Sequence, residues 1–444
     1  LSCNGSINGL LSKESNPLLN MNYHIENGHF TLKSRPFMLK HVGLDGKITN
    51  GEDRNFITTK IEIGQFDAET ENGSIKGDFT IKNLNKYYLT ANLSSTWDLS
   101  EVNHYFEDSP FFDLTGRFSA TTNYKGNFSF NKKFEDYFIN ALHNSEINFL
   151  NVNFKYLDSP LNFNIYSANF SLNNDIMNIK NSSLNVSESD FTFTGEVESF
   201  IPYILQKTNK MYVRGSLISS KMLFNELMTI KDISKGESTS SLPKWISVDI
   251  NSYVTDFIYD NFNASNLSGK IQYNNQVLRG VGLIANSLEG HLHAGFVLTE
   301  PTNNYLVLKA DLEFDEINIR KSFESFQNFN QDFIHQNELN GVGTAELEIE
   351  AHWKPSFIFN NKKLKIKSHL VIEQGELINF KPLENLSSFV SLDDLRHVKF
   401  STLENTIEVK NKIITIPAME IKSSALSVFL SGTHTFEQEI DYSI

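Results

Sequence analysis

Apolar and polar residues alternate along many stretches of this chain. In 75–81 (IKGDFTI), 191–197 (FTFTGEV) and 306–314 (LVLKADLEF), apolar side chains recur at every second position. Successive side chains of a β-strand point to opposite faces. Each stretch therefore predicts a strand with one apolar and one polar face. This favours an antiparallel sheet, because strands of parallel sheets read as unbroken apolar runs.

The alternating stretches recur in similar surroundings. A strand with a central glycine is followed by a second alternating strand, at 89–97, 211–217 and 306–314, and then by a short helical pattern, at 99–106, 222–227 and 317–323. The central glycines, which are 118, 100 and 137 residues apart, are Gly77, Gly195, Gly295 and Gly432. This spacing predicts a large unit of hairpins that is repeated about four times.

The repeats suggest a division of the chain. We expect a first β unit over 1–125, a second over 126–234, a polar linker over 235–243 and a third β unit over 244–355. A C-terminal β region follows over 356–444, where the fourth copy is cut short.

Two segments show helical rather than alternating spacing. Their apolar positions are Phe323, Phe326, Phe329 and Phe333 in the first segment, 321–339, and Leu383, Leu386, Phe389, Val390 and Leu395 in the second, 382–398. Each segment is expected either to cover part of the core or to cap an exposed sheet edge.

An antiparallel sheet must cover its apolar face. The few helices are far too short to cover roughly 30 strands, the number that follows from about 12 residues per strand and turn. A closed sandwich or barrel remains the alternative. Because the repeat runs the full length with one clear linker, we favour an all-β fold with a few short helices, in which an elongated, twisted antiparallel sheet curls into a U-shaped apolar trough built from repeated hairpin units.

The apolar face of the alternating strands is then a candidate lipid-binding groove. Its residues are expected to be Phe79, Ile81, Leu89, Leu93, Phe191, Phe193, Val197, Val213, Leu217, Leu292, Phe296, Leu298, Leu306, Leu308, Leu312, Leu426, Val428 and Leu430. The same residues serve as ordinary core if the sheet is sealed.

Composition and charge exclude some classes of partner and of structure. The chain has 36 Phe and 15 Tyr, which suit pleated surfaces, and its net charge of −14 argues against nucleic acid as a partner. Its single cysteine, Cys3, excludes an internal disulfide, and we expect an incidental free thiol there. The chain begins at Leu1 rather than Met and stops within an alternating pattern, so we expect both ends to be trimmed.

Candidate catalytic and metal sites are weak. The GVGLIA stretch at 280–285 fits a loose dinucleotide fingerprint but is followed by alternation rather than a helix. His291 and His293 share a strand face, but no third metal ligand lies nearby in the sequence. The acidic residues at 311, 313 and 315 are expected to form the polar, solvent-facing side of a strand rather than an acid–base pair. His434 is expected to make local hydrogen bonds. We therefore expect no enzyme activity, no cofactor and no metal.

The C-terminal segment resembles the C-terminal region of the AsmA family. The resemblance rests on 375–383 (GELINFKPL), 395–403 (LRHVKFSTL), 407–426 (IEVKNKIITIPAMEIKSSAL), Gly432-Thr-His434 and Asp441-Tyr442. It covers about 70 residues, and the upstream repeats are compatible with that family.

The resemblance implies a function. AsmA-like proteins are bridge-like lipid transfer proteins of the bacterial envelope, anchored in the inner membrane and extended through the periplasm. For this chain the resemblance implies a phospholipid or other two-tailed lipid as ligand, which is moved between the inner and outer membrane. It also implies attachment to the inner membrane through an anchor that this chain lacks, and a possible outer-membrane protein partner. The alternatives are a structural or assembly factor for outer-membrane proteins and an elongated adhesin or carbohydrate-binding β-protein.

Overall fold

The structure is a computed structural model of the 444-residue chain. It describes all residues except 14, 33–36, 104–110, 129–134, 157–158, 205–207, 209, 228–241, 303–304, 332–333, 355–357, 382–390, 392–394, 424–426, 438 and 444. The statements below concern the described residues.

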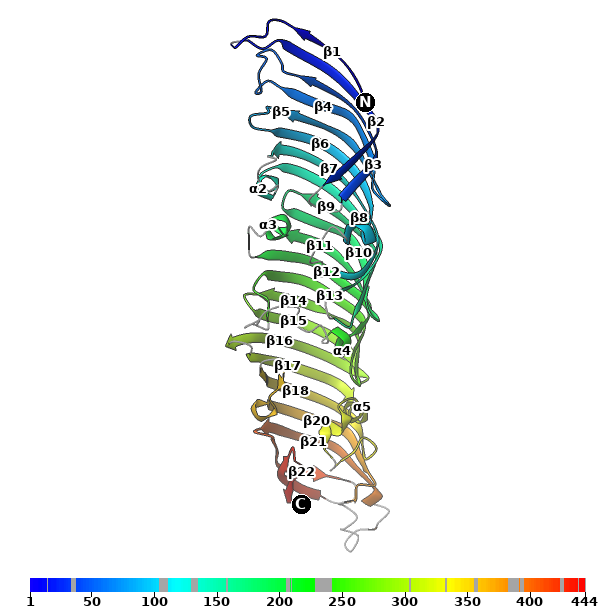
Figure 1. The fold of residues 1–444 in the computed structure, drawn as a ribbon. Helices are drawn as coiled ribbons and strands as arrows, with labels where there is room; N and C mark the ends of the chain where they lie inside the picture. The colour runs from blue at the N-terminus through cyan, green and yellow to red at the C-terminus, as the bar shows by residue number, and fades with distance from the viewer. Residues whose placement is uncertain are drawn as a thin grey trace. The chain divides into compact units, whose positions relative to one another are not determined.

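Most of these residues lie in the strands of one open antiparallel sheet (Figure 1). The strands are β1 (Ser2–Asn8), β2 (Leu18–Leu32), β3 (Phe37–Thr49), β4 (Lys60–Glu69), β5 (Ser74–Lys82), β6 (Tyr88–Asp98), β7 (Phe111–Asn127), β8 (Leu142–Tyr156), β9 (Asn162–Asn173), β10 (Ile176–Val186), β11 (Ser189–Glu198), β12 (Met211–Leu223), β13 (Ile246–Tyr259), β14 (Phe262–Asn274), β15 (Val277–Ser287), β16 (Gly290–Thr302), β17 (Tyr305–Asn318), β18 (Leu339–Lys354), β19 (Ile358–Phe359), β20 (Lys365–Ile378), β21 (His397–Lys410), β22 (Ile413–Lys422), β23 (Ser427–Thr435) and β24 (Ile440–Ser443).

The predicted all-β, antiparallel class is confirmed. The estimate of roughly 30 strands was too high, since the described residues form a sheet of 24 strands, many of which are 13 to 17 residues long. Long strands use more residues per hairpin than the short average strand on which the estimate was based.

The chain forms two compact units, which are described separately. Unit 1 comprises Leu1–Ser187 and Phe191–Gly215, and unit 2 comprises Glu188–Asp190 and Ser216–Ile444. Within each unit, strands that follow one another in the chain pair side by side (Figure 1). The finer division into four repeat units stays a prediction.

Cross-strand registers explain why alternation produces an apolar face. In unit 1, Phe79 of β5 lies opposite Ala91 of β6. In unit 2, Leu298 of β16 lies opposite Leu308 of β17. Residues directly opposite one another in an antiparallel pair share a face, so each register brings apolar side chains into contact.

Three of the four recurring glycines, Gly77, Gly195 and Gly432, are required by close backbone approach. A Cβ atom at Gly77, whose φ is +156°, would lie 2.0 Å from the Asn92 carbonyl oxygen. A Cβ atom at Gly195 would lie 2.1 Å from the carbonyl oxygen of Arg214. Gly295 differs, because its nearest neighbour would be 3.8 Å away, so packing does not account for its recurrence.

The helices are short and follow strands. They are α1 (Leu99–Asn103), α2 (Glu135–Phe138), α3 (Phe200–Ile204), α4 (Phe224–Leu227) and α5 (Ile319–Ser325), with 3₁₀ turns η1 (Gln327–Asn330) and η3 (Asn361–Lys363). The predicted helices at 99–106, 222–227 and 317–323 correspond to α1, α4 and α5. The last two begin two residues later than predicted, because β12 and β17 continue into them.

The remaining irregular segments are only partly described. Residues 104–106, most of the predicted linker and most of the second helical segment, with Phe333 of the first, lie outside the described residues. At the end of the second segment, Leu395 is buried and helical. The strand β21 begins at His397, so the helical expectation for Val398 was wrong.

Unit 1 has small apolar clusters under its sheet. Ala91, Tyr124 and Ala141 are buried together, and the ring of Phe138 from α2 stacks on Tyr124 with centroids 5.9 Å apart. The buried Glu101 carboxylate of α1 accepts hydrogen bonds at 3.0 Å from the Thr70 hydroxyl and from two backbone N–H groups of the β4–β5 turn. These bonds satisfy a buried charge and fix α1 to the turn.

Candidate functional site

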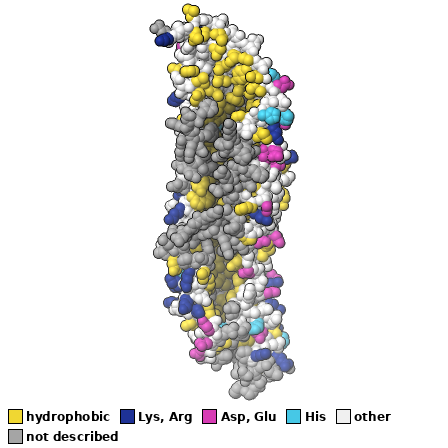
Figure 2. Space-filling view, in the orientation of Figure 1, with side chains coloured by type: hydrophobic (Ala, Val, Ile, Leu, Met, Phe, Trp, Pro, Cys, Tyr) yellow, Lys and Arg dark blue, Asp and Glu magenta, His cyan; other side chains and the backbone are white. Residues whose placement is uncertain are grey.

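An apolar groove of about 420 Å³ is the best-formed site in the described part of unit 2. Figure 2 shows hydrophobic side chains gathered in a hollow over the lower strands. The groove is bounded by the inward faces of β17, β18 and β20 to β24 and by the α5–η1 segment. Its lining residues include Phe314, Ile317, Leu347, Ile366, Leu370, Ile372, Leu377, Val398, Phe400, Leu403, Ile407, Val409, Ile414, Ile416, Met419, Ile421 and Leu430.

Among the described residues, the groove lining contains no charged side chain. Its polar members are Ser322, Gln331, Ser368, Ser423, His434 and Tyr442. The Ser322 hydroxyl donates to the Ile319 carbonyl at 2.7 Å, and the Ser368 hydroxyl donates to the Ile407 carbonyl at 3.1 Å. Burial raises the pKa of Tyr442 above its usual value, so its phenol stays neutral. The lining therefore offers an apolar surface rather than an acid–base pair.

The floor of the groove is buried while its walls are accessible. Val398 and Phe400 are 1% and 4% exposed, whereas Leu370 and Leu403 are half-buried. Because the strands belong to a single sheet, no second sheet seals this face within the described residues. The arrangement is an open groove, in which apolar side chains remain available for a ligand.

The α5–η1 segment lies over one end of the groove. Asn318 begins the helix, and its side chain accepts a hydrogen bond from the Lys321 N–H. The Phe323 and Phe329 rings meet edge to face with centroids 5.0 Å apart, and Phe326 stacks on Phe262 of β14 at 5.6 Å. Phe326 and Phe329 are nevertheless 38% and 50% exposed. Aromatic side chains therefore form an accessible edge of the groove.

The predicted groove residues on β16 and β17 share one face of these strands, and only some of the predicted residues of unit 2 line this groove. Leu430 lines it, and Leu292 and Leu312 belong to the adjoining apolar cluster. Phe296, Leu298, Leu306 and Leu308 share that face of β16 and β17 but lie outside the lining, and Leu217 of β12 is half-buried. Leu426, and the side chain of Val428, lie outside the described residues.

Three of the predicted residues of unit 1 lie beside one of its apolar clusters. Phe79, Leu89 and Leu93 pack against the cluster around Tyr124, and Ile81 lies opposite Leu89. Further along the sheet, Phe191 and Val197 are buried, and Phe193 and Val213 are half-buried. Their expected role in binding lipid stays a prediction.

Sequence reasoning missed the largest part of the groove lining. The predicted set has members on β17 and β23 but none on β18 or on β20 to β22. These strands supply Leu347, Leu370, Leu403 and Ile416. The same alternation identifies them: positions 366, 368, 370 and 372 of β20 all line the groove. The period-two pattern of β20 therefore marks its groove face in the sequence itself.

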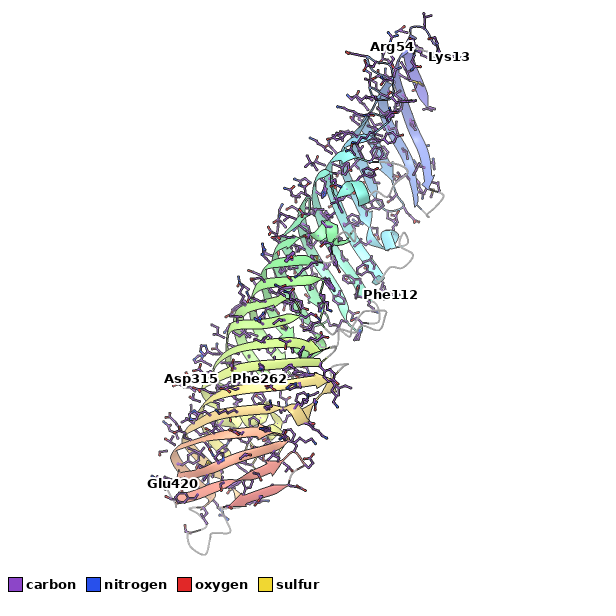
Figure 3. All side chains as sticks on the ribbon, turned by 90° about the vertical axis from the view of Figure 1, so that its left-hand side faces the viewer. Lys13, Arg54, Phe112, Phe262, Asp315 and Glu420 are labelled. Atoms are coloured by element: carbon purple, nitrogen blue, oxygen red, sulfur yellow. The ribbon has the colours of Figure 1, made fainter. Side chains whose placement is uncertain are left out.

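The weak chemical candidates lie on strands, and none of them is among the described residues that line the groove. The 280–285 stretch is part of β15. His291 and His293 are exposed, as are Asp311, Glu313 and Asp315, and Figure 3 shows Asp315 and Glu420 on the same side of unit 2. Across the described residues, no group of three or more His, Cys, Asp or Glu side chains is placed to hold a metal.

His434 differs from its expectation. It was expected to make local hydrogen bonds, but it is 3% exposed, lines the groove and has no side-chain hydrogen bond within the described residues. A Gly-Thr-His-Thr sequence does not specify the strand face on which its histidine lies. Cys3 is exposed and free.

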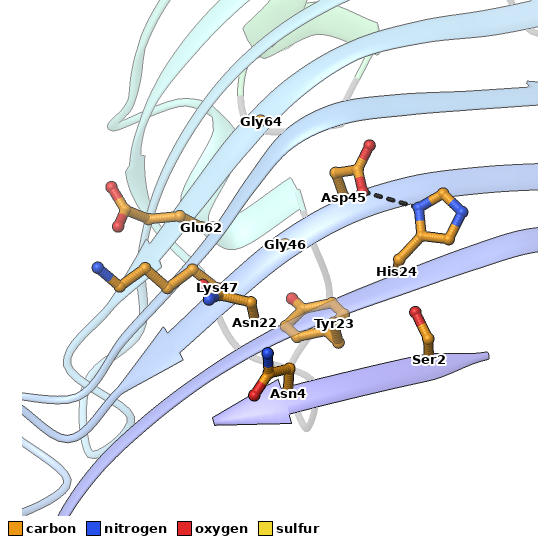
Figure 4. Close-up of a pocket in the computed structure, with 10 residues that line it drawn as sticks. All are labelled: Ser2, Asn4, Asn22, Tyr23, His24, Asp45, Gly46, Lys47, Glu62 and Gly64. Carbon is orange, nitrogen blue, oxygen red and sulfur yellow. Dashed lines mark hydrogen bonds and ion pairs between the residues drawn. The ribbon is translucent and has the colours of Figure 1, made fainter. Parts of the chain in front are cut away.

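A second hollow, of about 450 Å³, lies on unit 1 (Figure 4). It is bordered mainly by polar side chains of β1 to β4, among which the His24 Nδ1 atom lies 2.7 Å from an Asp45 carboxylate oxygen. Both side chains are about half exposed, so water competes for their interactions. This hollow is a weaker candidate than the groove of unit 2.

No helix in the described chain is both long and apolar enough to span a bilayer. No protein-family model, curated protein or solved structure matches the chain, so the AsmA-like resemblance stays a prediction.

Proposed function

We propose that the chain binds the acyl chains of lipids in the groove of unit 2. The observation that supports this proposal most strongly is an open apolar face whose described lining residues include no Asp, Glu, Lys or Arg. An exposed apolar surface of this kind is costly in water unless something covers it. A flexible hydrocarbon chain fits a long, weakly polar groove without needing precisely placed hydrogen-bond partners.

The energetics favour lipid as the ligand. Each methylene group removed from water contributes about 0.8 kcal/mol, so a two-tailed lipid with about 30 methylenes gains roughly 25 kcal/mol when fully shielded. This gain cannot be obtained in free solution. A protein that shields the tails during movement lowers the barrier to transfer between membranes.

The AsmA-like resemblance extends the proposal to a biological setting. In this setting the protein acts in the bacterial periplasm, attached to the inner membrane, as part of a bridge that moves phospholipids between the inner and outer membranes. It acts by binding and not by catalysis, and an outer-membrane protein is a possible partner. These extensions rest on the residues of the C-terminal segment.

Native mass spectrometry of the gently purified chain tests the proposal. We expect co-purifying phospholipid with the unaltered protein and about tenfold less with Leu370→Asp, which places a charge in the groove. The matched control is Val371→Asp, one residue along the same strand, where the side chain faces Thr344 and Glu404 on the other face. This control should retain its lipid.

Two outcomes would contradict the proposal. The first is a well-folded unaltered chain that carries no lipid and takes up none from vesicles. The second is equal lipid loss in both variants, which would show that the lipid does not bind specifically to the groove face of β20. Capture of unfolded outer-membrane strands without lipid would instead favour the assembly-factor alternative.

A further inference from the structure

Two neighbouring turns of unit 1 expose four apolar side chains. Leu10 and Leu11 lie in the turn between β1 and β2 and are 81% and 80% exposed. Phe56 and Ile57 lie in the loop between β3 and β4 and are 66% and 59% exposed. We call these four residues the apolar tip. Apolar side chains exposed to this degree are unfavourable in water when they gather in one place.

Hydrogen bonds join the two turns. The Asn16 side-chain amide donates to the Arg54 carbonyl at 3.1 Å. The Asn50 side-chain amide donates to the Pro17 carbonyl at 2.8 Å. The Arg54 side chain also lies against Gly9, where an added Cβ atom would be 3.0 Å from the Nη1 atom. The two apolar pairs therefore belong to one connected part of unit 1.

Local hydrogen bonds hold the second apolar pair in its exposed position. The side-chain oxygen of Asn55 accepts hydrogen bonds from the backbone N–H groups of Ile57 at 2.9 Å and Thr58 at 3.0 Å. An asparagine that bonds the backbone two residues later forms a tight turn. The Phe56 carbonyl accepts a further bond at 2.7 Å from the N–H of Leu84, which follows β5. The loop is therefore ordered already, and binding a partner requires little further ordering.

The charges beside the apolar tip are balanced. Figure 3 shows Lys13 of the first turn and Arg54 of the second at the same end of unit 1. The other charged residues that the structure describes in these turns are Glu52 and Asp53, which offset the two cations. The partner of this surface is therefore selected by its apolar interior rather than by the sign of its charge.

The size of the apolar tip favours a bilayer over a protein as its partner. Four side chains with these exposed fractions present on the order of 400 Å² of apolar surface. A stable protein–protein interface buries about 800 Å² on each partner. The hydrocarbon boundary of a bilayer accepts single apolar side chains that point in different directions, because it is fluid and needs no matching pockets.

We infer that the apolar tip inserts into the interfacial region of a lipid bilayer, so that unit 1 binds a membrane surface reversibly. The tip contacts the membrane as a surface, whereas the groove of unit 2 is proposed to hold the chains of single lipids. This inference does not depend on the proposed function of the groove.

The test is flotation of the full chain with phosphatidylcholine vesicles, in which bound protein rises with the lipid through a density gradient. We expect the unaltered chain to float, with little change between low and high salt because the charges of the tip cancel. The tip variant should need at least tenfold more lipid for half-maximal binding, because the apolar area that enters the bilayer is lost. It carries Leu10→Ser, Leu11→Ser, Phe56→Ser and Ile57→Ser.

The matched control removes four other apolar side chains that are about half exposed, and it should bind vesicles as the unaltered chain does. It carries Phe112→Ser, Leu150→Ser, Tyr166→Ser and Ile218→Ser. Melting temperatures of both variants establish that the fold is intact. The tip variant should also release a lipid already held in the groove of unit 2 at an unchanged rate, because the tip belongs to unit 1.

A second measurement leaves most of the tip in place. An environment-sensitive dye is attached at Ile57→Cys or, as a control, at Ile218→Cys, in a chain whose single native cysteine is removed by Cys3→Ser. We expect vesicles to shift the dye emission to shorter wavelength at position 57 only, because only this dye enters the hydrocarbon boundary.

Several outcomes would overturn the inference. They are absence of vesicle binding by the unaltered chain, equal binding by the tip variant, and equal dye shifts at both positions. Binding that requires anionic lipid and disappears at high salt would assign the contact to charged residues instead. Dimerisation that is lost in the tip variant, without vesicle binding, would assign the tip to a contact between copies of the chain. Each of these results leaves acyl-chain binding in the groove to be decided by its own measurement.

Discussion

At the scale of single residues, buried polar groups determine how the stability of this sheet depends on pH. His143 of β8 is 4% exposed, its ring stacks on Phe138 at 4.2 Å, and its Nδ1 atom has no hydrogen-bond partner within the described residues. Burial lowers the pKa of His143 below 6.5, although the nearby Asp175 opposes this effect. The imidazole is therefore held neutral in the folded state.

A neutral, buried histidine makes unit 1 sensitive to acid. Between the lowered folded pKa and 6.5, the unfolded chain binds a proton that the folded chain does not, so stability falls as the pH decreases through this range. We expect the urea midpoint to fall between neutral pH and about pH 5, and to fall less in His143→Phe. An identical pH dependence in the variant would show that another group is responsible.

At the scale of elements, the α5–η1 segment determines access to the groove. It is held by the Asn318 cap at its start, and Asn328 and Phe329 adopt left-handed backbone angles, with φ of 53° and 56°, at its end. Phe326 and Phe329 remain partly exposed although they border the groove. We interpret these rings as contacts that slow the release of a bound chain.

Removing these rings should accelerate lipid release. We expect Phe326→Ser with Phe329→Ser to raise the dissociation rate of a fluorescent lipid about tenfold, because apolar contact area is lost. Because both rings are partly exposed, the unfolding free energy should change by about 1 kcal/mol or less. Phe56→Ser with Phe112→Ser removes two exposed rings of unit 1 and should leave release unchanged. Equal rates in all three proteins would contradict a role for the segment.

The sequence predicted individual strands more directly than it predicted the groove of unit 2. Alternation located β5, β11 and β17 to within two residues at their first positions, because a side-chain period of two is a local property. The groove depends on which strands lie beside the α5–η1 segment, a non-local feature. Alternation marks the apolar positions of β20 to β22, but their place beside the α5–η1 segment and the inward position of His434 follow only from the register of the strands.

At the scale of the whole molecule, the structure distinguishes a sheet with an open apolar face from a sheet whose apolar face is sealed by a second layer. Alternation predicts an apolar face equally well for a sealed sandwich and for an open groove. The described strands form one sheet, and half-buried residues such as Leu370 and Leu403 leave part of that face accessible in unit 2. The polar face carries acids and lysines in opposition, as Glu348 and Lys367 illustrate. The two faces therefore offer different chemistry to a ligand.

The most direct measurement is photo-crosslinking with a phospholipid that carries a diazirine at the end of one acyl chain. After loading and irradiation, peptide mass spectrometry locates the adducts. We expect adducts on groove-lining side chains of β20 and β21, such as Leu370 and Leu403, and none on their outward neighbours Val371 and Glu404. Adducts distributed equally over both faces, or confined to the outward face, would contradict the claim that the apolar groove holds lipid chains.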